Sequence, residues 1–105
     1  MITYDDELLR KAIIYNGGKT QVLVGVEELS ELQKELLKNV NRGEDNLDHI
    51  KEELVDVLIM VRQLVFIYGF GLSELNKIAS EKQARLKGRL NGKLENKTGS
   101  FTGRS

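Results

Sequence analysis

Two acidic signatures, each inside an apolar helical stretch, contain the residues best suited to chemistry. They are Glu27-Glu28-x-x-Glu31 and Glu52-Glu53-x-x-Asp56. A spacing of three places two side chains on one face of a helix, about one turn apart, so each helix would carry a pair of carboxylates. Like charges this close repel one another, and the repulsion grows as water is removed. Hard divalent cations such as Mg²⁺ or Mn²⁺, which prefer oxygen ligands, would neutralise them.

A solvated acidic face is the alternative, because Glu favours helices and most Glu-x-x-Glu pairs lie in water. The second signature argues against it. In the stretch 54–70, LVDVLIMVRQLVFIYGF, the strongly polar residues are Asp56, Arg62 and Gln63. At about 100° per residue, Asp56 falls on the same side of the helix as Met60. A carboxylate among apolar groups is costly unless it is paired or bound to a metal, so we expect a metal site.

The composition limits the kind of protein that these carboxylates belong to. A chain of 105 residues without Pro, rich in Leu, Glu and Lys, is expected to form one small all-α domain over residues 1–92. Residues 93–105 lack a periodic apolar pattern and are expected to form a flexible tail. The absence of Cys excludes disulfides and thiolate ligands. The stretch 54–70 is short for a membrane span and is interrupted by charge, and no signal peptide is recognisable, so we expect a cytoplasmic protein without a membrane segment.

The apolar periodicity and the Gly and Asn positions predict four helices. The first runs from an N-cap at Thr3 to Tyr15, the second from about 19 to 41, the third from 47 to 68 after a cap at Asn46, and the fourth from a cap at Ser73 to Leu90. The third helix is apolar on nearly all sides after Leu54, and one small chain can hardly cover it. We therefore expect a four-helix bundle completed by oligomerisation, as a homodimer or homotetramer with the third helix at the interface.

Charge is divided unevenly along a chain whose formal net charge is zero. Residues 1–76 carry 14 acidic and 8 basic side chains, whereas residues 77–105 carry 2 acidic and 8 basic ones. An acidic metal-binding part joined to a basic helix suits an anionic ligand that itself binds cations, such as a nucleoside polyphosphate. Phe101 is the single aromatic residue of the basic segment, so we do not expect a nucleic-acid partner held by stacking.

The two signatures resemble those of the MazG-like all-α nucleoside triphosphate pyrophosphohydrolases. The family pattern of E-E-x-x-E, a gap, and E-x-x-D before an apolar helix is matched by Glu27, Glu28, Glu31, Glu53 and Asp56. Gly18-x-x-Gln21, before the first signature, and Tyr68-Gly69-Phe70, after the second, are also similar to features of many members. The resemblance covers about residues 10–90 and implies a four-helix MazG-like bundle.

The resemblance also implies an activity, which is Mg²⁺-dependent cleavage of a (d)NTP between its α- and β-phosphates. The products would be a (d)NMP and pyrophosphate, and the role would be housecleaning of the nucleotide pool. Glu28, Glu31, Glu53 and Asp56 would be the metal ligands, with Mn²⁺ as an alternative metal, and Glu27 would orient a ligand or a water. General chemistry agrees, because Mg²⁺ neutralises charge on phosphate oxygens and turns a bound water into a nucleophile.

Three further residues are candidates for contact with the nucleotide. Gln21 lies seven residues before Glu28 and on the same flank of its helix, as does Glu35, and Gln21 could contact the base or the sugar. Lys82 and Arg85 lie on one face of the fourth helix and could bind the phosphates. A solvated basic face is the alternative for this pair.

The sequence leaves other functions open. A phosphoribosyl-ATP pyrophosphohydrolase and a dUTP or dCTP hydrolase belong to the same superfamily, and the preferred base depends on the shape of the pocket. A non-catalytic helical interaction module, whose acids only aid solubility, is the alternative from another class. A di-iron carboxylate bundle fits less well, because such sites use paired Glu-x-x-His motifs and His49 is the only histidine. We interpret His49 as a surface or capping residue.

Overall fold

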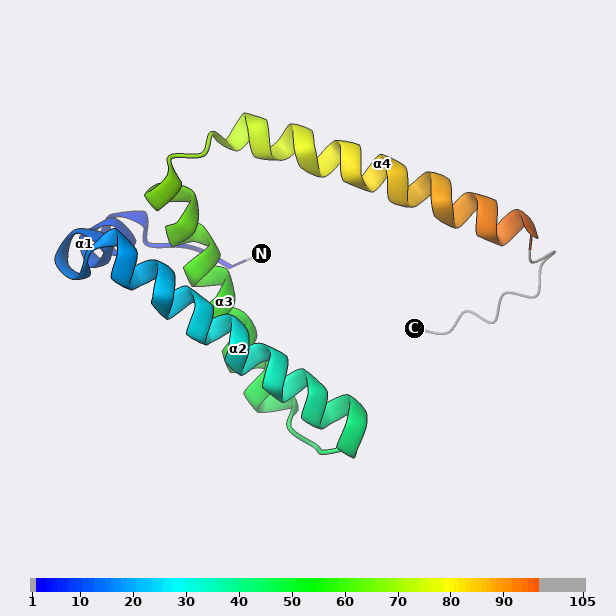
Figure 1. Cartoon of the computed structure of the whole chain (residues 1–105), viewed down its shortest axis with the longest axis horizontal. Coiled ribbons are helices and arrows are strands. Elements are labelled where there is room, and N and C mark those ends of the chain that lie inside the picture. The colour runs from blue at the N-terminus through cyan, green and yellow to red at the C-terminus, as the bar shows by residue number, and fades with distance from the viewer. Residues whose placement is uncertain (1, 97–105) are drawn as a thin grey trace. The chain divides into compact units, whose positions relative to one another are not determined.

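The computed structural model describes residues 2–96, which form four helices and no strand (Figure 1). They are α1 (Asp6–Asn16), α2 (Gly18–Arg42), α3 (Leu47–Tyr68) and α4 (Leu72–Asn96). The predicted all-α class is confirmed. The chain divides after Gly69 into two compact units, which are a body made of α1, α2 and α3 and a second unit that contains α4. Across the part of the chain that is described, no helix combines the length and apolar character that a membrane crossing requires.

In the body, α2 and α3 run side by side in opposite directions, and α1 packs against both of them (Figure 1). Gly43 follows the last residue of α2 and Gly69 follows the last residue of α3, and their backbone φ angles are 65° and 67°. Glycine adopts this left-handed conformation without a steric penalty, and both residues donate their N–H groups back to the preceding helix. The two glycines therefore fix the ends of the helices that carry the acidic signatures.

A bidentate ion pair joins α1 to α3. Arg62 donates from Nε to Asp6 Oδ1 (3.0 Å) and from Nη2 to Asp6 Oδ2 (2.8 Å), and these hydrogen bonds lower the pKa of Asp6. The guanidinium of Arg10 lies over the ring of Phe66, 4.3 Å from its centroid. These contacts hold α1 against the end of the α2–α3 pair.

Some helix ends differ from the prediction. Asp5, rather than Thr3, caps α1, because its side chain accepts a hydrogen bond from the N–H of Leu8 (3.1 Å). α4 begins at Leu72, so the predicted cap Ser73 lies inside its first turn. The helix continues to Asn96 and includes residues 93–96, which were expected to belong to the tail. Residues 97–105 of the expected tail lie outside the described residues.

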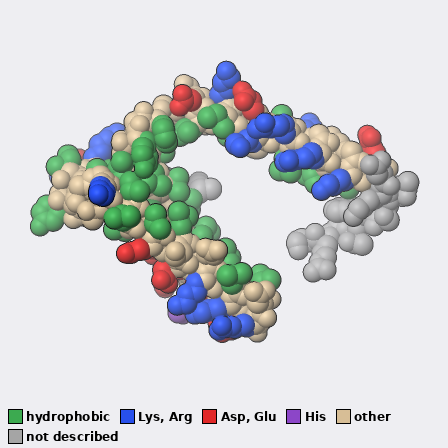
Figure 2. Space-filling model, viewed as in Figure 1, with side chains coloured by type: hydrophobic (Ala, Val, Ile, Leu, Met, Phe, Trp, Pro, Cys, Tyr) green, Lys and Arg blue, Asp and Glu red, His purple; other side chains and the backbone are tan. Residues whose placement is uncertain are grey.

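The body has a small core and an extensive apolar surface. Leu9, Val57 and Met60 are its buried hydrophobic side chains. Along α3, by contrast, side chains that are 45–57% exposed recur every seven residues, and they are Leu47, Leu54, Val61 and Tyr68. Residues seven apart stay on one side of a helix, so these four form an apolar row along the whole of α3. Figure 2 shows hydrophobic side chains gathered over much of the visible face of the body.

Candidate metal centre

Three of the predicted acids come together where α2 and α3 pack. Glu28 of α2 and Glu53 and Asp56 of α3 each offer one carboxylate oxygen, and these oxygens lie within 4.8 Å of one another. Oxygens that share one Mg²⁺ ion lie about 3 to 4 Å apart, so small side-chain movements would complete such a set. We call these three residues the carboxylate group.

The surroundings make the carboxylate group unfavourable by itself. Burial raises the pKa of Glu28, and the charges of Asp56 and Glu53 raise it further. The pKa of Glu53 is also raised, first by burial and then by Asp56. Among residues 2–96, no Lys or Arg forms an ion pair with any of the three carboxylates.

One oxygen of the carboxylate group lacks any described partner. Glu53 Oε2 is buried and accepts no hydrogen bond from the described residues. A buried acceptor without a donor is costly, and a buried charge is more so. A hard cation would supply both the missing contact and the missing positive charge, so these residues fit a divalent metal ion.

The remaining predicted acids lie beside this group. Glu31 is exposed on α2 and lies outside the set of three, although its charge contributes to the raised pKa of Glu28 and of Glu53. Glu27 is also exposed on α2. The roles of Glu31 as a ligand and of Glu27 as a supporting acid stay predictions.

The expected burial of Asp56 is wrong. We expected its carboxylate to lie among apolar groups, but Asp56 is exposed, whereas Met60 one turn later is buried. A helix buries only the parts of its surface that pack against its neighbours, and Asp56 lies outside the buried part of α3. The apolar sequence around Asp56 covers other sides of α3, some of which are themselves exposed.

Gln21 forms hydrogen bonds inside the body. Its side chain is 6% exposed, donates from Nε2 to Gln63 Oε1 (2.8 Å) and accepts a hydrogen bond from Asn16 Nδ2 (3.1 Å). A contact between Gln21 and a base or sugar would have to form in addition to these bonds, and it stays a prediction.

The predicted phosphate-binding residues belong to the second unit. Lys82 and Arg85 lie on one side of α4, together with Arg89. Their contact with phosphates stays a prediction. His49 is a surface residue, as interpreted, because its side chain is 72% exposed, with Nδ1 3.8 Å from Glu35 Oε1.

Sequence reasoning missed the pairing of Glu35 with Asn46. Both residues are buried, and Asn46 Nδ2 donates to the backbone oxygen of Glu35 (2.9 Å) and to its Oε1 (3.1 Å). Hydrogen bonds from Asn46 and from Lys38 lower the pKa of Glu35. Asn46 does precede α3, as predicted, but its side chain bonds α2 instead of capping α3. The spacing of seven between Glu28 and Glu35 was the available signal, and it did not reveal the partner.

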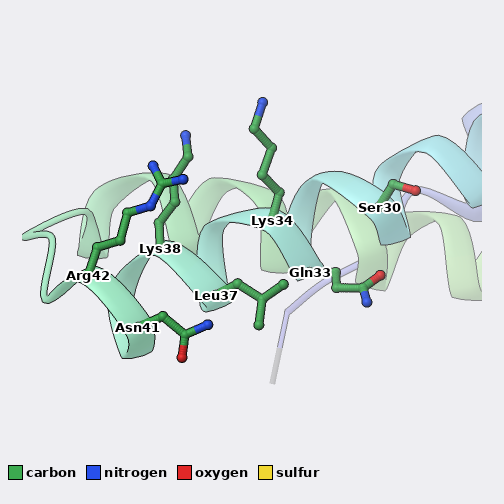
Figure 3. A pocket seen from close by; sticks show the side chains of 7 residues that line it. All are labelled: Ser30, Gln33, Lys34, Leu37, Lys38, Asn41 and Arg42. Carbon is green, nitrogen blue, oxygen red and sulfur yellow. The ribbon is translucent and has the colours of Figure 1, made fainter.

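Three of the four basic side chains of α2 lie near its C-terminal end. Figure 3 shows Lys34, Lys38 and Arg42 extending from this part of the helix, with Gln33 and Leu37 nearby. All residues that line this surface come from α2, so it is an open groove along one helix. Within it, Lys38 Nζ lies 3.2 Å from Glu35 Oε2, so Glu35 has the ion pair that the carboxylate group lacks.

Comparison with known proteins found no matching family model, no matching curated protein and no matching solved structure. The resemblance to MazG-like enzymes therefore rests on sequence motifs alone, chiefly the two acidic signatures and their spacing. The geometry and chemistry of the carboxylate group are the observations that bear on function.

Proposed function

We propose that this protein is a Mg²⁺-dependent nucleoside triphosphate pyrophosphohydrolase, which cleaves a (d)NTP to a (d)NMP and pyrophosphate. The observation that carries the proposal is the convergence of Glu28, Glu53 and Asp56 from two helices. These carboxylates have no Lys or Arg ion pair among residues 2–96, and Glu53 Oε2 is buried without a partner. Oxygen donors in this arrangement suit a hard cation, and their sequence context is similar to that of the MazG-like family.

Each residue has a distinct role in the proposed reaction. Glu28, Glu53 and Asp56 would hold Mg²⁺ or Mn²⁺, with Glu31 available at the margin of the site. When bound, such a cation neutralises charge on phosphate oxygens and activates water as a nucleophile. Glu27 would orient that water or a ligand.

The substrate would be bound by residues outside the carboxylate group. Lys82 and Arg85 would bind the outer phosphates, since paired basic side chains suit phosphate oxygens. Gln21 would contribute to recognition of the base or sugar. An enzyme that acts on the nucleotide pool would work in the cytoplasm.

We further propose that a second copy of the chain, or a pair of dimers, completes the bundle. The small core and the exposed row on α3 support this proposal. Apolar side chains repeated every seven residues are typical of helices that pack along their length against another helix. A symmetric pair of α3 helices is the simplest way to cover the row.

The test is the release of pyrophosphate from a panel of substrates. The panel contains the standard NTPs and dNTPs, dUTP and phosphoribosyl-ATP, each with Mg²⁺, with Mn²⁺ and with EDTA. We expect equal amounts of pyrophosphate and nucleoside monophosphate, no orthophosphate, and no reaction in EDTA. Absence of hydrolysis across the panel would overturn the proposal and leave the helical interaction module as the alternative.

A further inference from the structure

Three polar sets lie between α2 and the segment made of α3 and its N-cap residue, and their members on α2 are seven residues apart. They are Gln21 with Gln63, Glu28 with Glu53 and Asp56, and Glu35 with Asn46. Seven residues make about two turns, so Gln21, Glu28 and Glu35 lie on the same side of α2. Their partners follow in the opposite order, from Gln63 through Asp56 and Glu53 to Asn46. The carboxylate group is the middle set, and we call Gln21–Gln63 and Glu35–Asn46 the outer pairs.

The outer pairs are buried and hydrogen-bonded. Gln21 and Gln63 are 6% and 4% exposed, and their amides are joined by a bond of 2.8 Å. Asn46 reaches across to both the backbone and the side chain of Glu35. Among residues 2–95, these four are the only buried polar side chains. Buried and hydrogen-bonded polar pairs therefore flank the carboxylate group on both sides.

The charges of the carboxylate group do not keep its three side chains close to one another. Glu28, Glu53 and Asp56 repel one another when ionised, and this repulsion favours any arrangement of the helices that separates them. Apolar contacts along a helix pair tolerate sliding, because one aliphatic side chain can replace another. Buried hydrogen bonds are directional, and the selection of one register is their best-attested use in helix pairs.

We propose that the outer pairs are positioning residues, which fix the register of α2 against α3 and so hold Glu28 within cation-binding distance of Glu53 and Asp56. The inference rests on the proposed function only in assuming that a divalent cation binds the carboxylate group. It adds residues that neither acidic signature contains. In this proposal the outer pairs lower the cost of assembling three like charges, and a bound cation meets ligands that are already in place.

The first test replaces Gln21 and Gln63 together with leucine. Changing both partners removes the two buried amides together, and Asn16, which loses its bond to Gln21, is exposed and can bond water instead. The helices should therefore remain packed, and thermal unfolding should occur near or above the original temperature. The affinity for Mn²⁺, measured by electron paramagnetic resonance of the free ion, should fall about tenfold or more, as expected when residues that orient metal ligands are lost. Gln33→Leu, at an exposed position of α2 (Figure 3), is the matched control and should bind Mn²⁺ normally.

A second variant covers the case in which the double leucine variant does not fold. Gln21→Asn keeps an amide but shortens its reach toward Gln63, and we expect an intermediate loss of Mn²⁺ affinity. Native Mn²⁺ affinity in folded variants of both designs would overturn the proposal. A fall in thermal stability with unchanged Mn²⁺ affinity would also overturn it, because the outer pairs would then be structural only.

An engineered disulfide can test the register of α2 against α3 directly, since the chain contains no cysteine of its own. A Cβ at Gly25 would lie 3.9 Å from Met60 Cβ, within the range of about 3.5 to 4.5 Å that a disulfide needs. Gly25→Cys with Met60→Cys, oxidised by glutathione disulfide, should therefore crosslink readily when the outer pairs are intact. With leucine at positions 21 and 63, the crosslink should form more slowly. Once formed, it should restore most of the lost Mn²⁺ affinity.

Rescue by the crosslink separates register from other effects of the leucine substitutions. Equal crosslinking rates in the two backgrounds, or a crosslinked chain that still binds Mn²⁺ weakly, would overturn the positioning role. If the unaltered protein binds no Mn²⁺, the proposed function fails, while the crosslinking rates still test the register. If it binds Mn²⁺ and hydrolyses nucleotides but the two backgrounds behave alike, only the present inference fails.

Discussion

The body and α4 differ in what their side chains contact. In the body, polar side chains reach residues that are distant in sequence, as in Gln21–Gln63 and Arg62–Asp6. In α4, none of the described side chains is buried, and Gln83 donates a hydrogen bond to the oxygen of Ala79, within the same helix. The residues predicted to form the nucleotide site therefore fall into two groups with different surroundings. The cation ligands are positioned by contacts within the body, whereas the predicted phosphate-binding residues lie on a helix whose surface is open.

The largest effect is expected from the carboxylate group. Asp56→Asn or Glu53→Gln should lower hydrolysis at least about a hundredfold, because each removes a ligand charge from a site that supplies several kcal/mol to catalysis. Circular dichroism should show unchanged helix content. Asp48→Asn, an exposed position on the same helix, is the control and should retain activity. Full turnover by the Asp56 or Glu53 variant at saturating Mg²⁺ would show that the body does not form the metal site.

A second prediction tests whether α3 of the body forms an interface between chains. The unaltered protein should sediment as a dimer or tetramer at micromolar concentration. Leu54→Glu together with Val61→Glu should raise the dissociation constant at least about a hundredfold, because two charges would be buried without partners. Ser30→Glu, on the exposed side of α2, should leave the assembly intact. A monomeric unaltered protein would contradict the prediction and require another cover for the row on α3.

A third prediction concerns α4. Lys82→Gln together with Arg85→Gln should raise KM for a nucleoside triphosphate about tenfold, the size of one hydrogen bond to a charged group, and should affect monophosphate binding less. Thermal stability should change little, because exposed charges contribute little to folding. Lys77→Gln with Lys87→Gln, on other sides of the helix, is the control.

Deletion of the residues from 96 onward sharpens the same comparison. We expect it to change neither KM nor stability. If the Lys82 and Arg85 variant binds nucleotide normally while the deletion abolishes activity, the phosphates are bound by the basic residues after α4 and not by its face.

The smallest effect is a pH dependence of stability within the body. The raised pKa values of Glu28 and Glu53 mean that the folded chain holds protons more tightly than the unfolded one. These groups therefore oppose folding at pH 7, and this penalty disappears as the pH falls toward about 4.3, the pKa of an unperturbed Glu. The lowered pKa values of Asp6 and Glu35 act oppositely, and their contribution is lost as the pH falls through those lowered values.

Thermal unfolding in EDTA and in Mg²⁺ measures this dependence. The rise in Tm caused by Mg²⁺, a few degrees in size, should be largest near pH 7 and should shrink toward pH 5, since protons compete with the cation. Asp48→Asn should show the same pH dependence as the unaltered protein. A Mg²⁺ effect that is constant from pH 5 to pH 7 would contradict the assignment of the carboxylate group as the cation site.

The sequence predicted those features that depend on one helix at a time. The bounds of α3 were predicted correctly, because Asn46 is a residue type that favours a helix start and Gly69 one that favours a helix end. The start of α1 was not, because Thr3 and Asp5 are both good N-caps and only the fold selects between them. The acidic residues of the site were predicted because side chains three residues apart lie on the same face of a helix. Periodicity indicates the side of a helix on which a residue lies, but it does not identify the residue opposite.

The regular interval between the three polar sets has a consequence for changes in chain length. One residue inserted between Gln21 and Glu28 would turn the glutamate about 100° relative to the glutamine, so the two could no longer face α3 together. One residue inserted between Glu28 and Glu35 would turn these two side chains apart in the same way. An insertion of seven residues, about two turns, would return them nearly to the same side of α2. The connection 43–46 can absorb added residues at its glycine end, because a longer loop there costs little entropy. Relatives of this protein should therefore vary in length at that loop and not within the helices.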